Sequence, residues 1–340
     1  MQTNLLASFT ALSLSLLISA QAPVGASGQP QDQKPAQDAT AKTALTAYTR
    51  VSGITGNLDS IGSDTLNNLM TLWSEGFKKM YPNVKMQVEG KGSGTAPPAI
   101  TEGKAQLGPM SRPMKKTEEE AFEKKHGFKP TGIKVAVDGL AVYVHKDCPL
   151  TELSLEQVDA VFSATRKGGG TDVSTWGQLG VTGAWADKPI SLYGRNSASG
   201  TYVYFKEHAL FGGDFKPSVK EQPGSASVVR SVGEDPYAMG FSGIGARTSE
   251  VKALRLAKKK GDPTYSTDEA DVLSGKYPLS RFLLVYVNKA PNKPLTPNVR
   301  EFLRFVLSAE GQAIVEKDGY LGLPPKVVAS ELRKVGDGEN

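Results

Sequence analysis

The sequence of 340 residues contains one cysteine and three histidines, and these scarcities exclude several kinds of site. Cys148 has no partner for an intramolecular disulfide, and it lies too far from the N-terminus to be a lipid-anchored cysteine at a signal cleavage site. His126, His145 and His208 are too widely separated to have the spacing of zinc ligands. We therefore expect no metal site and no cofactor.

Long apolar runs are also scarce. Residues 5–20 form an uncharged, mostly apolar run followed by small residues, as in a signal peptide, although no Lys or Arg precedes it. At about sixteen residues the run is shorter than the roughly twenty of a membrane-spanning helix. We expect a signal peptide over residues 1–26, a flexible leader rich in Gln, Pro, Ala and Asp over residues 27–49, and a soluble periplasmic protein without a lipid anchor.

The charge balance favours an anionic ligand. Forty Lys and Arg exceed thirty-five Asp and Glu, which gives a formal net charge of +5 and a pI near 9.0. The basic residues are scattered among the acids, and the one basic run, residues 258–260, precedes Gly-Asp-Pro as at a solvated helix end. We expect no nucleic-acid partner.

The remaining chain, about 310 residues after cleavage, is long enough for two domains. Short strands and helices alternate from residue 50, which is typical of an α/β protein. Two long β segments bracket a self-contained middle region, so the chain crosses into a second domain and returns. We expect strands at 84–88, 190–193, 239–244 and 282–288 and a long β segment at 133–145 that is interrupted at Asp138-Gly139. We expect helices at 66–80, 155–162, 202–210 and 299–316, and a further helix that opens at 96–98.

Three loops have a similar composition. Loop A (62–65) reads Gly-Ser-Asp-Thr, loop B (90–95) reads Gly-Lys-Gly-Ser-Gly-Thr, and loop C (195–201) reads Arg-Asn-Ser-Ala-Ser-Gly-Thr. Each follows an expected strand and opens an expected helix, where free N–H groups attract anions. Ser and Thr add hydroxyl donors, and Arg195 adds a planar fork that can bind an oxyanion through two hydrogen bonds. The alternative is that all three are ordinary helix caps.

Nucleotide and hydrolase motifs do not fit these loops. Loop B lacks the final glycine of the dinucleotide fingerprint and the Gly-Lys-Ser/Thr ending of a phosphate-binding P-loop. None of the three loops contains the Gly-x-Ser-x-Gly turn of serine hydrolases. The residues thus favour binding over catalysis.

Residues 193–205, Tyr-Gly-Arg-Asn-Ser-Ala-Ser-Gly-Thr-Tyr-Val-Tyr-Phe, resemble the Arg-x-x-x-Ser-Gly-Thr signature of PstS-like phosphate-binding proteins of ABC-type uptake systems. Weaker matches include loops A and B, Gly-Pro-Met-Ser-Arg-Pro at 108–113 and Tyr-Pro-Leu-Ser-Arg at 277–281. The resemblance implies the two-lobed type II periplasmic-binding-protein fold, with a mixed sheet flanked by helices in each lobe and two crossover segments. Lobe I would comprise residues 50–137 and 282–340, and lobe II residues 138–281.

The resemblance also implies the phosphate contacts, which come from loops A, B and C and from the stretch after the second helix. They would be Thr65, Leu66 through its backbone, Ser93, Ser111, Arg195, Ser199, Gly200 and Thr201.

The chain departs from the family pattern at two positions. Ser111-Arg112 and Ser197 stand where some members have acids. An acceptor-only carboxylate favours protonated phosphate over sulfate, because sulfate has no proton to donate at neutral pH. Asp138 and Asp64 are the remaining candidate acceptors of the phosphate proton, with a hinge or turn role as the alternative for Asp138.

We therefore expect a monomeric, non-enzymatic binding protein that captures inorganic phosphate between two lobes and delivers it to an inner-membrane ABC permease. Three alternatives remain at this point. They are a binding protein for another tetrahedral oxyanion such as sulfate or molybdate, an exported phosphate-ester hydrolase, and a phosphate-sensing or adhesive module.

Overall fold

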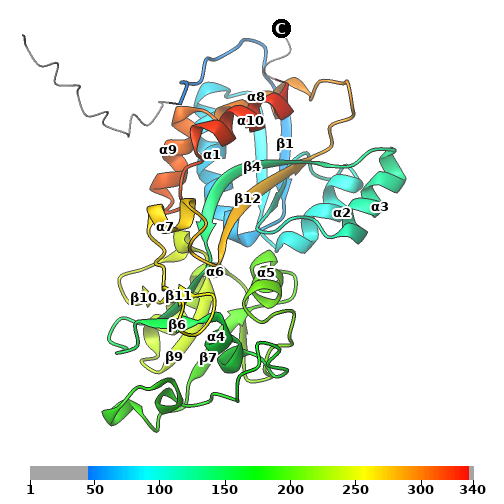
Figure 1. The fold of residues 1–340 in the computed structure, drawn as a ribbon. Helices are drawn as coiled ribbons and strands as arrows, with labels where there is room; N and C mark the ends of the chain where they lie inside the picture. Colours follow the sequence, from blue (N-terminus) through cyan, green and yellow to red (C-terminus); the bar gives the residue numbers. More distant parts are fainter. Residues whose placement is uncertain (1–44, 337–340) are drawn as a thin grey trace, which may run out of the picture. The chain divides into compact units, whose positions relative to one another are not determined.

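Two sets of strands form the framework of the computed structural model, which describes residues 45–336 (Figure 1). In the first set, β1 and β2 pair in parallel, and β3, β12 and β4 form an antiparallel sheet in that order. A parallel bridge between Ser60 and Leu107 joins these strands into what we call sheet I. Its strands are β1 (Gly56–Ile61), β2 (Val84–Glu89), β3 (Gly108–Met110), β4 (Thr131–Gly139) and β12 (Ser280–Val287).

The second set, sheet II, is a mixed five-stranded sheet in the order β10-β5-β9-β7-β8. Only Leu140 separates β4 of sheet I from β5 of sheet II, and β12 returns the chain to sheet I. We call the parts of the chain built around sheets I and II lobe I and lobe II. The strands of sheet II are β5 (Ala141–His145), β7 (Ser191–Arg195), β8 (Lys220–Gln222), β9 (Ala238–Ser242) and β10 (Val251–Ala253), and beside them β6 (Glu152–Ser154) pairs with β11 (Arg255–Ala257).

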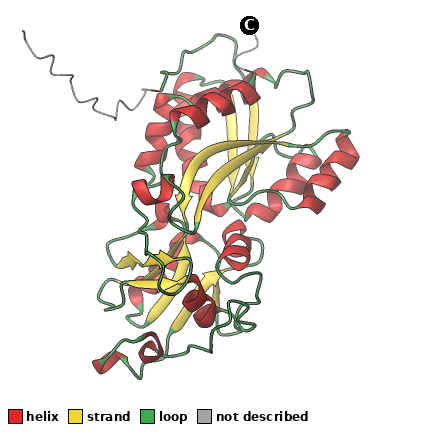
Figure 2. Ribbon diagram, in the orientation of Figure 1, coloured by secondary structure: helices red, strands yellow, loops and turns green. Residues whose placement is uncertain are grey.

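Helices accompany the strands of both sheets (Figure 2). Those that precede β4 or follow β12 are α1 (Asn67–Met80), α2 (Ala96–Thr101), α3 (Lys116–His126), α8 (Pro297–Val306), α9 (Ala309–Lys317) and α10 (Pro325–Val335). Those between β5 and β12 are α4 (Leu155–Phe162), α5 (Gly200–His208), α6 (Ser225–Glu234) and α7 (Glu269–Leu273).

Helix α1 shows how the apolar pattern sets the packing. Leu69, Met70, Trp73 and Phe77 recur every three or four residues and are all completely buried. The Trp73 indole also donates a hydrogen bond to the carbonyl of Gly311 in α9, at 2.9 Å. The helix predicted for this region is therefore confirmed.

The single helix expected over residues 299–316 is wrong, because the chain breaks into α8 and α9. Helix α8 ends at Val306, and the Ser308 hydroxyl caps α9 by accepting from the Gly311 N–H at 3.2 Å. The two helices approach so closely that a Cβ on Gly311 would lie 2.1 Å from the Phe305 carbonyl oxygen. Amphipathic periodicity continues through this corner, so the pattern alone did not reveal it.

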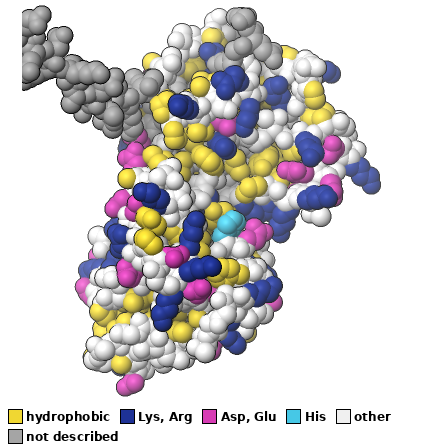
Figure 3. All heavy atoms as spheres, in the orientation of Figure 1, with side chains coloured by type: hydrophobic (Ala, Val, Ile, Leu, Met, Phe, Trp, Pro, Cys, Tyr) yellow, Lys and Arg dark blue, Asp and Glu magenta, His cyan; other side chains and the backbone are white. Residues whose placement is uncertain are grey.

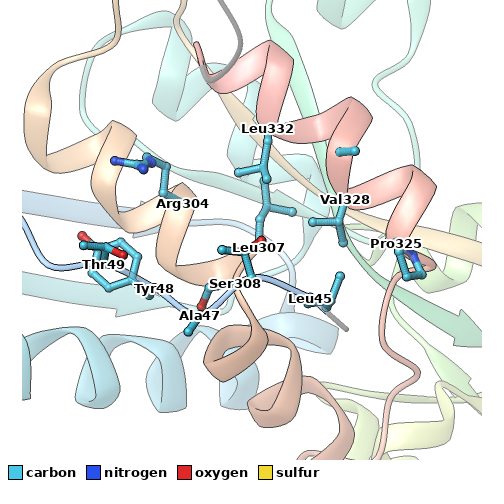
Figure 4. A pocket seen from close by; sticks show the side chains of 12 residues that line it. Leu45, Ala47, Tyr48, Thr49, Arg304, Leu307, Ser308, Pro325, Val328 and Leu332 are labelled. Atoms are coloured by element: carbon cyan, nitrogen blue, oxygen red, sulfur yellow. The ribbon is translucent and has the colours of Figure 1, made fainter. Parts of the chain in front are cut away.

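The predicted signal peptide, residues 1–26, lies outside the described residues, and of the predicted leader only residues 45–49 are described. The Tyr48 hydroxyl is within 2.7 Å of the Tyr81 hydroxyl and donates to the buried Glu301 at 3.0 Å. This stretch lines a pocket together with Leu307 of the turn between α8 and α9 and Val328 of α10 (Figure 4).

The described residues also show features that bear on membrane insertion, surface charge and thiol reactivity. No helix within residues 45–336 has the length and apolarity to cross a membrane. Basic and acidic side chains are interspersed over the face in Figure 3. Cys148 is buried and unbonded to another cysteine, and burial raises the pKa of its thiol.

Replacing Phe77 by alanine tests the packing of lobe I. Phe77 lies edge-on to Phe302, with ring centroids 5.4 Å apart. We expect Phe77→Ala to lower the free energy of unfolding by about 3–5 kcal/mol in urea titrations, because it leaves a cavity in the core. Phe211 is 42% exposed, so Phe211→Ala should change stability by less than about 0.5 kcal/mol. Equal losses for the two variants would contradict this account of the core.

Candidate functional site

Loops A, B and C each connect a strand to a helix, as the sequence predicts. Loop A follows β1 and leads through a 3-10 turn into α1, and loop B follows β2 and leads in the same way into α2. Loop C follows β7 of sheet II and opens α5, where the Ser199 hydroxyl accepts from the Thr201 and Tyr202 N–H groups at 3.1 and 3.4 Å. The cap hypothesis thus holds for Ser199, whereas no side-chain cap bond is formed at the 3-10 turns of loops A and B.

The three loops meet although they belong to different lobes. The Thr65 hydroxyl of loop A lies 2.9 Å from the Thr201 hydroxyl of loop C. The Gly94 N–H of loop B donates to the Ala198 carbonyl of loop C at 3.0 Å. Ser111, which follows β3, joins this cluster through its hydrogen bonds with Ser93 of loop B.

The serine hydroxyls are linked to one another beside Gly200. Ser93 accepts a hydrogen bond from the Ser111 N–H at 3.0 Å, and the Ser111 hydroxyl lies 3.2 Å from the hydroxyls of both Ser93 and Ser63. A Cβ on Gly200 would lie 2.3 Å from the Ser93 hydroxyl oxygen and 2.7 Å from that of Ser111. Only glycine therefore allows the start of α5 to approach this cluster.

Thr65 is held from behind by lobe I. Its carbonyl accepts from the hydroxyl of the buried Tyr320 at 2.9 Å. Leu66, the next residue of the same 3-10 turn, buries its side chain in the core. The Thr65 carbonyl and the Leu66 side chain thus anchor loop A in lobe I, while the Thr65 hydroxyl contacts Thr201 of lobe II.

Arg195 is 1% exposed and only partly satisfied. Its guanidinium donates to the Ser225 hydroxyl at 2.8 Å and to the Pro223 carbonyl at 3.3 Å. Its buried Nε–H has no hydrogen-bond partner among the described residues. Burial lowers the pKa of Arg195, the nearby Asp64 opposes this shift, and the charge of Arg281 adds to it. A buried unpaired N–H is costly, so this donor is suited to an anionic acceptor.

Asp64 reaches from loop A into lobe II. One carboxylate oxygen lies 3.3 Å from an Arg195 guanidinium nitrogen and accepts from the Ser225 N–H at 2.9 Å. Asp64 therefore caps α6 and balances Arg195 at once. Ser197, the position where some family members have an acid, is exposed, and Asp64 supplies the carboxylate beside the arginine instead.

Asp138 is completely buried at the end of β4, where it pairs with Arg281 of β12. One of its oxygens accepts from two nitrogens of Arg281 at 2.9 and 2.7 Å, and the other accepts from the Ile244 N–H at 2.9 Å. Arg281 also donates to Thr201, so it belongs to the candidate site. The sequence offered one signal for Arg281, the Tyr-Pro-Leu-Ser-Arg match at 277–281, but no role could be attached to it.

Arg112 donates hydrogen bonds outside this cluster, to the Pro113 carbonyl and the Glu118 carboxylate. It forms two hydrogen bonds with the Glu118 carboxylate of α3, at 2.8 and 2.7 Å. Within residues 45–336 no group of three or more His, Cys, Asp or Glu could hold a metal ion. The candidate site thus consists of hydroxyls, one helix start and two guanidiniums, a set of hydrogen-bond donors that suits an anion.

Removing the Asp64 carboxylate tests whether it joins the lobes. We expect Asp64→Ala to lower the free energy of unfolding by about 1–2 kcal/mol, because α6 loses its cap and the buried Arg195 loses its counter-charge. Asp214 is a suitable control, since it forms a solvent-exposed ion pair with Lys206, and Asp214→Ala should have a clearly smaller effect. Urea unfolding in phosphate-free buffer measures both, and wild-type stability of Asp64→Ala would refute the role of Asp64.

Comparisons with known proteins identify the family of this chain. Residues 34–310 match the family model of a PBP superfamily domain. The phosphate-binding protein PstS of Pseudomonas aeruginosa is 58% identical over 294 residues, which are 86% of this chain and 91% of the relative.

Two solved structures share the fold. A Clostridium perfringens protein assigned as a phosphate ABC transporter substrate-binding protein, solved with bound phosphate, has a TM-score of 0.67 and 25% identity, and the match covers 79% of this chain and all of that one. A Planctomyces limnophilus protein described as a possible phosphate-binding protein has a TM-score of 0.62 and 27% identity over 85% of this chain and all of that one. The expected two-lobed type II fold is therefore confirmed. The chain belongs to the periplasmic-binding-protein superfamily and, within it, to the family of PstS phosphate-binding proteins.

Proposed function

We propose that this protein captures inorganic phosphate between its two lobes and delivers it to the membrane permease of an ABC-type phosphate uptake system. The observation behind the proposal is the buried Nε–H of Arg195, which has no partner among the described residues, on an arginine that belongs to loop C and contacts Asp64 of loop A. The PstS protein of Pseudomonas aeruginosa, at 58% identity, supports phosphate as the ligand.

The ligand would be held by the residues that the family signature indicates. Arg195 supplies a charge-assisted donor, and the hydroxyls and N–H groups at the starts of the helices supply neutral ones. The contacts of loops A and B with loop C cross from one lobe to the other, so binding at these loops would favour lobe closure and exclude water. The proposed ligands are Thr65, the Leu66 backbone, Ser93, Ser111, Arg195, Ser199, Gly200 and Thr201.

The wider assignment follows from the same proposal. We assign residues 50–137 and 282–340 to lobe I and residues 138–281 to lobe II, which agrees within two residues with the end of β4 and the start of β12. The protein would act as an exported, periplasmic monomer without an enzymatic activity or a cofactor. Its partner would be the inner-membrane permease.

Selection of phosphate over sulfate requires an acceptor for the phosphate proton. Asp138 and Asp64 stay our candidates, although both carboxylates already accept hydrogen bonds from the protein. Competition calorimetry with sulfate and molybdate tests this choice. Asp138→Asn or Asp64→Asn should narrow the preference for phosphate over sulfate if the substituted carboxylate accepts that proton.

Arginine 195 provides the direct test of the function. We expect Arg195→Ala to weaken phosphate binding by about 2–5 kcal/mol in calorimetry, because a buried charged donor is lost. Arg255 is exposed on β11, where its guanidinium bonds to Thr264, and Arg255→Ala should bind like the wild type. Unchanged affinity in Arg195→Ala would refute the assignment of Arg195, and no phosphate binding by the wild type at millimolar concentration would refute the function.

A further inference from the structure

Arg281 and Asp138 form a buried pair where the chain crosses between the lobes. They are directly opposite one another in the antiparallel pairing of β12 with β4. Their exposed fractions are 6% and 0%, and the carboxylate is fully engaged by the guanidinium and by the Ile244 N–H. Asp138 pairs with the charge of Arg281, and the guanidinium also offers its surroundings directed N–H groups.

Those N–H groups reach both lobes. One terminal nitrogen of Arg281 donates to the Ser111 carbonyl at 2.9 Å, and the other donates to the Thr201 hydroxyl oxygen at 2.9 Å. The Tyr204 ring packs against the guanidinium, with its centroid 5.3 Å from the central carbon, and its hydroxyl donates to the Ser280 carbonyl at 2.8 Å. The guanidinium plane is therefore fixed on several sides.

The bond to Thr201 determines how that hydroxyl can be used. A guanidinium only donates hydrogen bonds, so the Thr201 oxygen must accept from Arg281. The Thr65 hydroxyl, 2.9 Å away, can donate to the second lone pair of the same oxygen, which leaves the single Thr201 hydrogen available for an anion. Without Arg281 the hydroxyl could rotate and present lone pairs to an anion, which would repel it.

We propose that Arg281, held by Asp138, is a positioning residue that fixes the Thr201 hydroxyl as a hydrogen-bond donor to the bound oxyanion. This inference rests on the proposed phosphate-binding function. It gives the buried Asp138–Arg281 pair a directional role in binding, through Thr201, in addition to joining β4 to β12.

A double-mutant cycle measured by phosphate calorimetry tests the coupling. The paired change Arg281→Gln with Asp138→Asn removes both charges together, so no buried charge is left unpaired. We expect it to raise the Kd for phosphate about 10- to 100-fold, as for loss of an oriented donor to a charged ligand. In the Thr201→Val background most of this loss should disappear, because no hydroxyl is left to orient.

Conservative variants separate orientation from structure. Thr201→Ser keeps the hydroxyl and should retain the full sensitivity to the Arg281 change. Arg281→Lys keeps the charge beside Asp138 but cannot bond to Asp138, Ser111 and Thr201 at once, so it should rescue little of the affinity. If the paired variant fails to fold, Arg281→Lys takes its place in the double-mutant cycle with Thr201→Val.

The Arg112–Glu118 pair is the matched control, since Arg112 is also buried and bonded twice to a carboxylate. Arg112→Gln with Glu118→Gln should leave the Kd unchanged. Additive losses in the cycle, or full rescue by Arg281→Lys, would overturn the role of Arg281. If the wild type binds phosphate and Arg195→Ala does not, such a result rejects this inference alone. If the wild type itself fails to bind, the proposed function is rejected as well.

Discussion

Two arginine side chains are buried where the strand-to-helix loops meet, and the need to balance their charges organises the residues around them. An isolated guanidinium in such a place would cost several kcal/mol. Asp64 and Asp138 remove that cost, and both lie where one lobe meets the other. The Asp64–Arg195 contact thus also brings the lobes together, whereas the Asp138–Arg281 pair joins β4 to β12 within sheet I.

Local signals explain what the sequence predicted correctly. Ser199 precedes a helix start, and its hydroxyl caps that helix, because capping involves residues only two or three positions apart. The apolar face of α1 was equally readable from its spacing. The corner between α8 and α9 was not, because it depends on the close approach of Gly311 to the Phe305 carbonyl rather than on a break in periodicity.

Tertiary pairings explain what the sequence could not reveal. Asp138 and Arg281 are 143 positions apart, and Asp64 and Ser225 are 161 apart. Neither of these long-range contacts can be inferred from the composition or the spacing of residues in the sequence. An arginine near the start of a strand and an aspartate before a glycine are each common. The pairing of Arg281 with Asp138 is therefore visible only from the register of β12 on β4.

The single cysteine has a practical consequence. Cys148 is enclosed, and burial disfavours its thiolate, which is the form that reacts with electrophilic labels. We therefore expect little reaction of the native protein with thiol-directed labels. A cysteine introduced at an exposed position near the junction of the lobes would therefore be labelled selectively by a fluorophore. The labelled variant could serve as an optical reporter of ligand binding, and Cys148 would not have to be replaced.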